Sequence, residues 1–171
     1  MGSGWLATTA CCKPNVHRDE RIAIDGVRIE TGETFAVDWV KETPFLFMVP
    51  QSKSDYGGNN VMEEIAPNVF AWYARLRQGS LTVKVGDSVK AGAPIGKLGS
   101  TGPSEGPHLH LGLLDKPDPF AGRSLPFVFD SFALVGAIDF DASKGDRLVV
   151  LPDSREVRSA YPLYGGILDY P

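Results

Sequence analysis

Short runs in which apolar and polar residues alternate, separated by glycine and proline, dominate the chain. Alternation of this kind is typical of a β-strand with one buried face. No long segment repeats its apolar residues at the helical period. The pattern therefore predicts a mainly β protein. The expected strands are Arg21–Ile24, Thr34–Val40, Phe45–Val49, Asn60–Ile65, Val69–Leu76, Ser80–Lys84, Ile95–Leu98, His108–Leu114 and Phe132–Ala137.

Turn residues predict how some of these strands connect. The dipeptide Asp25-Gly26 is a strong hairpin signal, so residues 21–24 are expected to pair with residues 27–29. Between Lys84 and Gly96 glycines alternate with short apolar anchors, which predicts successive tight turns across a sheet edge.

The pattern of apolar and polar residues changes beyond about Pro117. Residues 125–129 and the proline-containing tail from Leu151 predict an extended wrap around the sheet. The polar stretch from Asp139 to Arg158 is expected to form a loop.

Length and composition predict one domain. The chain has 171 residues, with 43% hydrophobic and 22% charged residues, as in ordinary globular proteins. We expect a core over about residues 20–137 and a C-terminal extension over about residues 138–171. A net charge of -4 without a basic run argues against a nucleic-acid partner. No apolar stretch has the ~18 residues that a transmembrane helix needs.

The N-terminal region offers few signals. Residues 1–5 lack the charged and apolar regions of a signal peptide. Cys11 and Cys12 are adjacent, and vicinal cysteines rarely bridge each other because the geometry is strained. A metal site that uses both thiols is one interpretation, and two small, partly buried residues are the other.

Two of the three histidines, His108 and His110, lie one residue apart in a predicted strand. Their side chains are expected on the same face, with Leu109 toward the core. Two imidazoles can bind a transition metal together, or one can bind it while the other moves a proton. The alternative is a pair of surface histidines without chemistry.

Asp38 is a carboxylate within the apolar strand 34–40, where it needs a partner unless it lies on an exposed face. A catalytic zinc site has three protein ligands and one open position. The simplest set in this chain is Asp38 and His110, with His17 or His108 as the third ligand.

Glycine-pinned turns and the paired histidines follow one another in a specific order. The pieces are Val83-Lys84-Val85-Gly86-Asp87, Ile95-Gly96, Gly99-Ser100-Thr101-Gly102 and Gly106-Pro107-His108-Leu109-His110. They resemble the core of the lysostaphin/LytM-type zinc metallopeptidases, most closely over residues 57–114. Tyr73-Ala74-Arg75-Leu76 and residues 35–39 extend this resemblance upstream.

The resemblance implies a mainly antiparallel β-sheet with a groove and a zinc ion at its floor. It implies cleavage of peptide bonds in bacterial peptidoglycan, so that peptidoglycan or a peptide is the expected partner. It also implies an extracytoplasmic location, although this chain shows no signal peptide.

The resemblance also implies roles for single residues. Asp38 and His110 match two zinc ligands, and His108 matches a catalytic histidine that does not bind the metal. Tyr73 and Arg75 are expected to line the groove with them.

Two positions depart from the family pattern. Thr34 stands where the family has its first histidine ligand, and Arg75 stands where the family has a second catalytic histidine. In one explanation His17 replaces the ligand and Arg75 stabilises the oxyanion as a fixed charge, but an arginine cannot act as a base. In the other explanation the metal site has been lost.

Rival functions follow from these departures. A catalytically degenerate relative would act as a wall-binding or regulatory module. Residues 85–96 also resemble the turns of biotin or lipoyl carriers, but Lys97 lies in the wrong setting for modification. A nucleophilic Ser100 or Ser104 lacks the Gly-x-Ser-x-Gly elbow that would support it.

Overall fold

The computed structural model describes residues 2–9, 21–24, 27–30, 37–40, 55–104, 106–139, 147–163 and 166–170. Within them the strands are β1 (Gly2–Thr9), β2 (Arg21–Ile24), β3 (Val27–Glu30), β4 (Val37–Val40), β5 (Asn59–Ala66), β6 (Val69–Leu76), β7 (His108–Leu114), β8 (Phe129–Asp139), β9 (Arg147–Ala160) and β10 (Gly166–Tyr170). No α-helix occurs in these ranges, and hence none that could span a membrane. The mainly β, antiparallel fold predicted from the sequence is confirmed.

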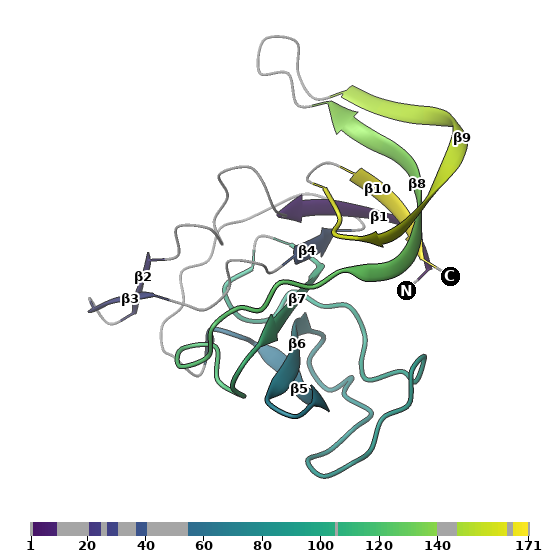
Figure 1. Ribbon diagram of the computed structural model, residues 1–171. Helices are drawn as coiled ribbons and strands as arrows, with labels where there is room; N and C mark the ends of the chain where they lie inside the picture. The colour runs from purple at the N-terminus through teal and green to yellow at the C-terminus, as the bar shows by residue number, and fades with distance from the viewer. Residues whose placement is uncertain are drawn as a thin grey trace.

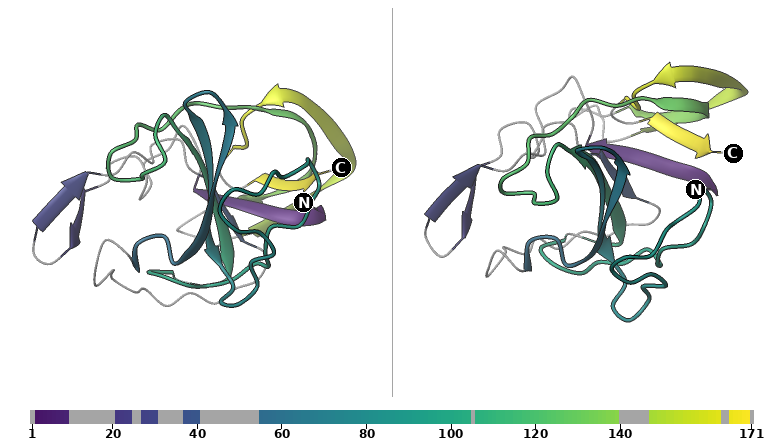
Figure 2. Two further views of the ribbon diagram at one scale, coloured as in Figure 1. Left: turned by 90° about the horizontal axis from the view of Figure 1, so that it is seen from below. Right: turned by 60° about the horizontal axis from the view of Figure 1, so that its bottom comes forward.

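One eight-stranded sheet contains all strands except the separate hairpin of β2 and β3 (Figure 1). Its order is β5-β6-β7-β4-β1-β10-β8-β9, with antiparallel pairing at every step. Strand β4 therefore lies between β7 and β1, and β10 lies between β1 and β8. Gly2 pairs with Tyr170, so the two ends of the chain lie side by side (Figures 1 and 2).

Several predicted elements are confirmed. The hairpin pairs Ile24 with Val27 across the predicted Asp25-Gly26 turn. Strands β6 and β7 have the predicted bounds, and β8 includes the predicted segment 132–137. The expected strand at 45–49 lies outside the described residues.

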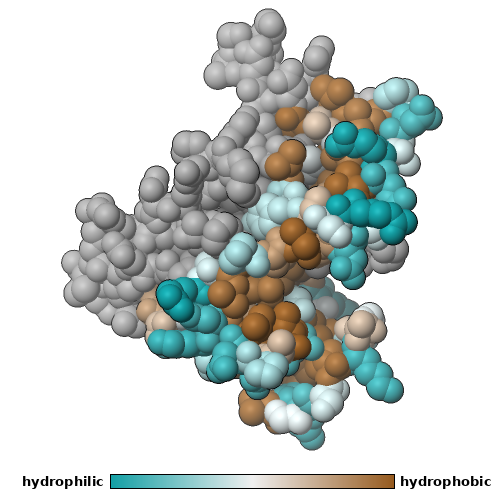
Figure 3. All heavy atoms as spheres, in the orientation of Figure 1, coloured by the Kyte–Doolittle hydropathy of each residue, from teal (hydrophilic) through white to brown (hydrophobic). Residues whose placement is uncertain are grey.

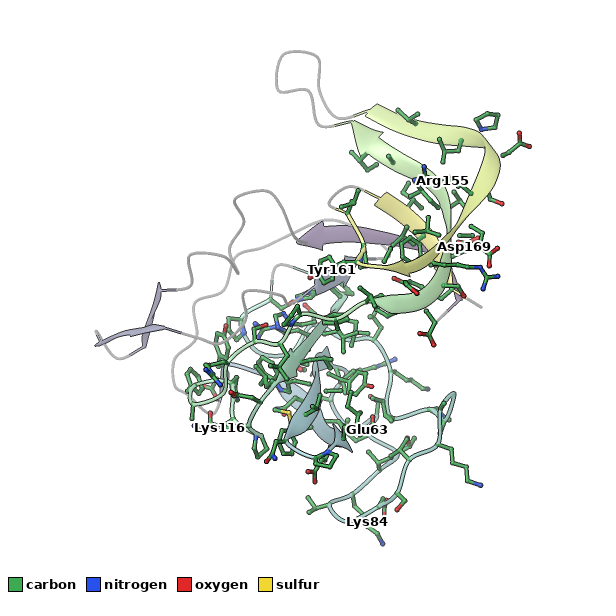
Figure 4. The ribbon with its side chains drawn as sticks, viewed as in Figure 1. Glu63, Lys84, Lys116, Arg155, Tyr161 and Asp169 are labelled. Atoms are coloured by element: carbon green, nitrogen blue, oxygen red, sulfur yellow. The ribbon has the colours of Figure 1, made fainter. Side chains whose placement is uncertain are left out.

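The predicted strands at 80–84 and 95–98 are wrong. These segments are joined by separate backbone bonds, such as the one from Thr82 N–H to the Ile95 carbonyl at 3.1 Å. Turns at Gly86 and Gly92, both with positive φ, lie in the stretch that connects the two segments. The result is a loop that projects away from the sheet, with Lys84 far from the strands (Figure 4).

The predicted polar loop over 139–158 is also wrong, since residues 147–158 belong to β9. This strand forms one edge of the sheet, and most of its side chains between 152 and 159 are exposed. An edge strand with a solvated face can carry polar residues, so composition alone does not distinguish it from a loop. The tail beyond Leu151 therefore contributes strands to the sheet.

The sheet is buried on both faces around β6 and β7. Tyr56, Trp72, Ala74 and Leu114 form a core cluster on one face. The other face carries a second cluster of Leu111, Phe132 and Leu168. In the space-filling view, hydrophobic residues gather over β5 to β7 and hydrophilic residues surround them (Figure 3).

Candidate functional site

Strand β7 carries both histidines of the His-Leu-His motif and pairs with β4 and β6. The β4–β7 register places Asp38 directly opposite His110. Residues paired in this way share a face of the sheet. Asp38 therefore occupies the face of His110 and His108. The side chain of Asp38, and all of His17 and Thr34, lie outside what the structure describes.

Aromatic residues hold the ring of His110, which is 1% exposed. The indole of Trp72 meets it edge-on, with ring centroids 5.1 Å apart and planes at 70°. The ring of Tyr56 stacks on the Trp72 indole, with ring centroids 6.0 Å apart. On β6 the partner of His110 is Ala74, whose small side chain leaves this imidazole room. The packing fixes the ring at the centre of the face.

His108 is buried at the start of β7, and its own loop holds it. Its N–H donates to the Gly99 carbonyl at 3.0 Å. Its ring Nδ1 lies 2.8 Å from the Gly106 carbonyl and 3.2 Å from Ser104 Oγ. Since a carbonyl only accepts hydrogen bonds, Nδ1 carries a proton in this arrangement. In the neutral ring Nε2 then holds the lone pair.

Residues 99–107, the glycine-rich loop before β7, are hydrogen-bonded to β5 and β6. Thr101 Oγ1 accepts from Asn59 N–H at 2.8 Å and donates to the Leu76 carbonyl at 2.7 Å. A Cβ at Gly99 would lie 2.2 Å from the main-chain nitrogen of Arg77, so no side chain fits there. This close approach explains why the motif needs glycine at residue 99.

Arg75 leaves the regular strand geometry, with a φ of 68°. Its side chain is 6% exposed, and Nη1 donates to the Tyr56 carbonyl. The guanidinium also lies over the Tyr56 ring, 5.6 Å from its centroid, and beside Gly102. Nε has no acceptor among the described residues. Arg75 thus fastens the turn before β5 to the glycine-rich loop.

Tyr73 lies on the opposite face from the histidines, because it pairs with Leu111. Its hydroxyl donates to Glu63 Oε2 at 3.2 Å. Glu63 belongs to the neighbouring strand β5 and is labelled in Figure 4. Burial, together with the negative charge and hydrogen bond of Glu63, raises the pKa of Tyr73 to about 12. The structure therefore does not bring Tyr73 to the face of His108 and His110.

The residues that support the two histidines are not evident from the sequence. Ser104 contacts His108 Nδ1, whereas the sequence suggests for it only the role of a nucleophile. Its spacing of four residues before His108, within a glycine- and proline-rich run, was the available signal. The aromatic support from Tyr56 and Trp72 left no motif in the sequence, because their contact with His110 depends on the fold.

The described residues supply only part of a zinc site. Among the described side chains no group of three or more His, Cys, Asp and Glu could hold a metal. Asp38 and His110 nevertheless supply adjacent backbone positions on one face, with an oxygen and a nitrogen donor of the kinds that zinc accepts. Two residues of the predicted ligand set thus occupy paired positions on neighbouring strands.

Comparisons with known proteins agree with this local architecture. Residues 47–121 match the profile of Peptidase family M23. Lysostaphin of Staphylococcus simulans is 49% identical over 60 residues, which cover 34% of this chain and 12% of that protein. The glycyl-glycine endopeptidase ALE-1 of Staphylococcus capitis is 46% identical over 60 residues, 34% of this chain and 16% of its own length.

The similarity thus spans only a small part of these longer relatives, and no solved structure matches the chain. The matched segment contains β5, β6, the glycine-rich loop and the His-Leu-His strand. Over this segment the chain is similar to peptidase family M23 and to its lysostaphin-type members.

Proposed function

We propose that the protein is a zinc-dependent endopeptidase that cleaves peptide bonds of peptidoglycan. The observation that carries this proposal is the register of Asp38 opposite His110, with His108 on the same face. The match of residues 47–121 to family M23 and the similarity to a protein named glycyl-glycine endopeptidase support a peptidase-like activity. A peptide of the cell wall is the substrate class that agrees with both.

Asp38 and His110 would hold the metal, and His17 is the candidate for a third ligand. Zinc at such a site supplies a Lewis acid and makes a bound water more acidic. The buried ring stack behind His110 would keep its imidazole in one orientation.

His108 would move protons during hydrolysis. With its proton on Nδ1, the neutral ring can accept a proton at Nε2 from the attacking water and later return one to the leaving amine. Arg75 would stabilise the turn that contains Tyr56 and would not contact the substrate. Tyr73 would stabilise the sheet from the face of β6 opposite the histidines.

A second candidate function is a wall-binding module without catalysis. The position of Arg75 favours it, because this guanidinium is committed to the Tyr56 carbonyl where the family has a catalytic histidine. Such a module would bind peptidoglycan fragments without cleaving them.

Replacing His110 separates these functions. We expect His110→Ala to abolish both zinc retention and cleavage of purified wall fragments, and His108→Ala to keep zinc but lose cleavage. Zinc is measured by elemental analysis and cleavage by chromatography of released peptides. Arg158→Ala, on the exposed edge strand β9, is the matched control for both measurements.

Cleavage by His110→Ala at the wild-type rate would refute the proposal. A wild type that binds fragments but neither retains zinc nor cleaves would establish the second function.

A further inference from the structure

Ser104 is a buried polar residue at the end of the glycine-rich loop, with 6% of its surface exposed. Its Oγ donates to the Gly106 carbonyl at 2.7 Å. The same oxygen lies 3.2 Å from His108 Nδ1 and 3.1 Å from Ser100 Oγ, and 3.4 Å from Gly106 N–H. One hydroxyl thus connects the loop, the carbonyl and the imidazole.

The direction of these hydrogen bonds follows from proton counting. A serine hydroxyl has one proton, and here it points to the Gly106 carbonyl. Toward His108 the oxygen of Ser104 therefore acts as an acceptor. The Gly106 carbonyl, 2.8 Å from the same Nδ1, is also an acceptor. Both oxygens favour a proton on Nδ1.

This arrangement differs from that of a nucleophilic serine. A serine nucleophile donates its proton to the imidazole that activates it. Ser104 instead donates to a main-chain carbonyl and faces the protonated nitrogen. Its chemistry is therefore that of a support for His108.

We propose that Ser104 is a positioning residue which, with the Gly106 carbonyl, holds His108 in the tautomer with the proton on Nδ1. The hydroxyl contributes in two ways, by orienting the carbonyl and by offering a second acceptor to Nδ1. A base must present its lone pair on the reacting atom, so this tautomer reserves Nε2 for proton transfer. Only this last step rests on the proposed endopeptidase function.

Nitrogen NMR of the full chain tests the tautomer directly. The protein is loaded with zinc, labelled with ¹⁵N-histidine and studied at a pH where His108 is neutral. Three histidines give three ring systems, and the spectrum of His108→Gln assigns the signal. We expect the proton on Nδ1 in the wild type, and a mixture of tautomers in Ser104→Ala.

Three further variants make the comparison specific. Ser104→Thr keeps the hydroxyl and should restore the wild-type signal. Ser100→Ala removes the hydroxyl that lies 3.1 Å from Ser104 Oγ, one step further from the imidazole, and should leave the signal unchanged. Ser104→Cys keeps the shape with a much weaker hydrogen-bonding group, and serves if Ser104→Ala does not fold.

The kinetics of the same variants extend the test to hydrolysis. Ser104→Ala should lower kcat about 10-fold with little change in KM, a part of the about 10²–10⁴-fold that a general base contributes. A proton on Nε2 in the wild type, or an unchanged tautomer in both Ser104→Ala and Ser104→Cys, would overturn the inference. If the tautomer responds but no variant cleaves wall fragments, the positioning role holds and the proposed function fails.

Discussion

At the scale of single residues, Arg75 combines features that rarely occur together. It has a left-handed backbone, a buried guanidinium and a hydrogen bond to a main-chain carbonyl. A charged donor is worth more than a neutral one when the carbonyl it serves is shielded from water. Tyr56, which supplies that carbonyl, also belongs to the ring stack behind His110. By holding Tyr56 in place, Arg75 therefore also stabilises the aromatic packing around His110.

Replacing Arg75 by alanine should destabilise the protein by about 1–3 kcal/mol, because the Tyr56 carbonyl loses its charged donor. Urea denaturation gives the free energy of unfolding. Arg77→Ala, two residues along and exposed, is the control and should change stability by less than about 0.5 kcal/mol. Equal losses in the two variants would contradict the role assigned to Arg75.

The candidate catalytic and metal-binding residues were easier to predict from the sequence than the groups that hold them in place. The spacing of His108 and His110 predicts both on one face, and in the structure Asp38 pairs with His110. The bond from His108 to the Gly106 carbonyl could not be read from spacing, because it depends on the path of the loop. Tyr73 was expected beside the histidines, and strand alternation alone already assigns it the other parity from Ala74.

At the scale of elements, the glycine-rich loop and the turn before β5 form one interlocked unit. Gly58 has a φ of 58°, and a Cβ there would lie 2.4 Å from the main chain of Thr101. Thr101 in turn bonds Asn59 and Leu76. Gly86 in the projecting loop also has positive φ, but a Cβ there would meet nothing within 4 Å. Glycine is therefore required at residue 58 by both its backbone conformation and the lack of space, but at residue 86 by its backbone conformation alone.

This difference predicts different costs of alanine. Gly58→Ala and Gly86→Ala both place a side chain in the left-handed region, which costs about 1–2 kcal/mol. Gly58→Ala should lose about 1–3 kcal/mol more, because the main chain of Thr101 has to move. Parallel urea titrations of the two variants measure the difference. A loss in Gly86→Ala as large as that in Gly58→Ala would disprove the interlock.

Elements with clear alternation and turns were predictable, as the β2–β3 hairpin, β6 and β7 illustrate. Polar composition concealed β9, since an edge strand exposes residues that elsewhere indicate a loop. The projecting loop was misassigned for the opposite reason. Its apolar anchors alternate, but segments 80–84 and 95–98 are joined by a separate backbone hydrogen bond from Thr82 to Ile95 and form no regular ladder.

At the scale of the whole molecule, β10 connects the C-terminal strands to the rest of the sheet. Its Leu168 is buried and packs in one cluster with Leu111 of β7 and Phe132 of β8. Leu111 follows His110 directly on the other face of the strand. The C-terminal strands therefore support the candidate site from behind. No local pattern predicted this, because the pairing of β1 with β10 joins residues far apart in the sequence.

We expect Leu168→Ala to cost about 2–5 kcal/mol of stability, as buried leucines do when a cavity replaces them. Leu163→Ala removes the same atoms from an exposed site shortly before β10 and should cost less than about 0.5 kcal/mol. The free energies of unfolding of both variants are measured in guanidinium chloride. Similar values for the two would mean that β10 is dispensable for the core.

The position of β10 between β1 and β8 also has a consequence in time. As the chain leaves the ribosome, β1 emerges before β10, and one of its edges stays open until β10 follows. Pairings between residues so distant in sequence form slowly. β1 is also the strand that flanks β4, the carrier of Asp38. During synthesis the residues that match family M23 are therefore made well before β10 completes the sheet beside β1 and β4.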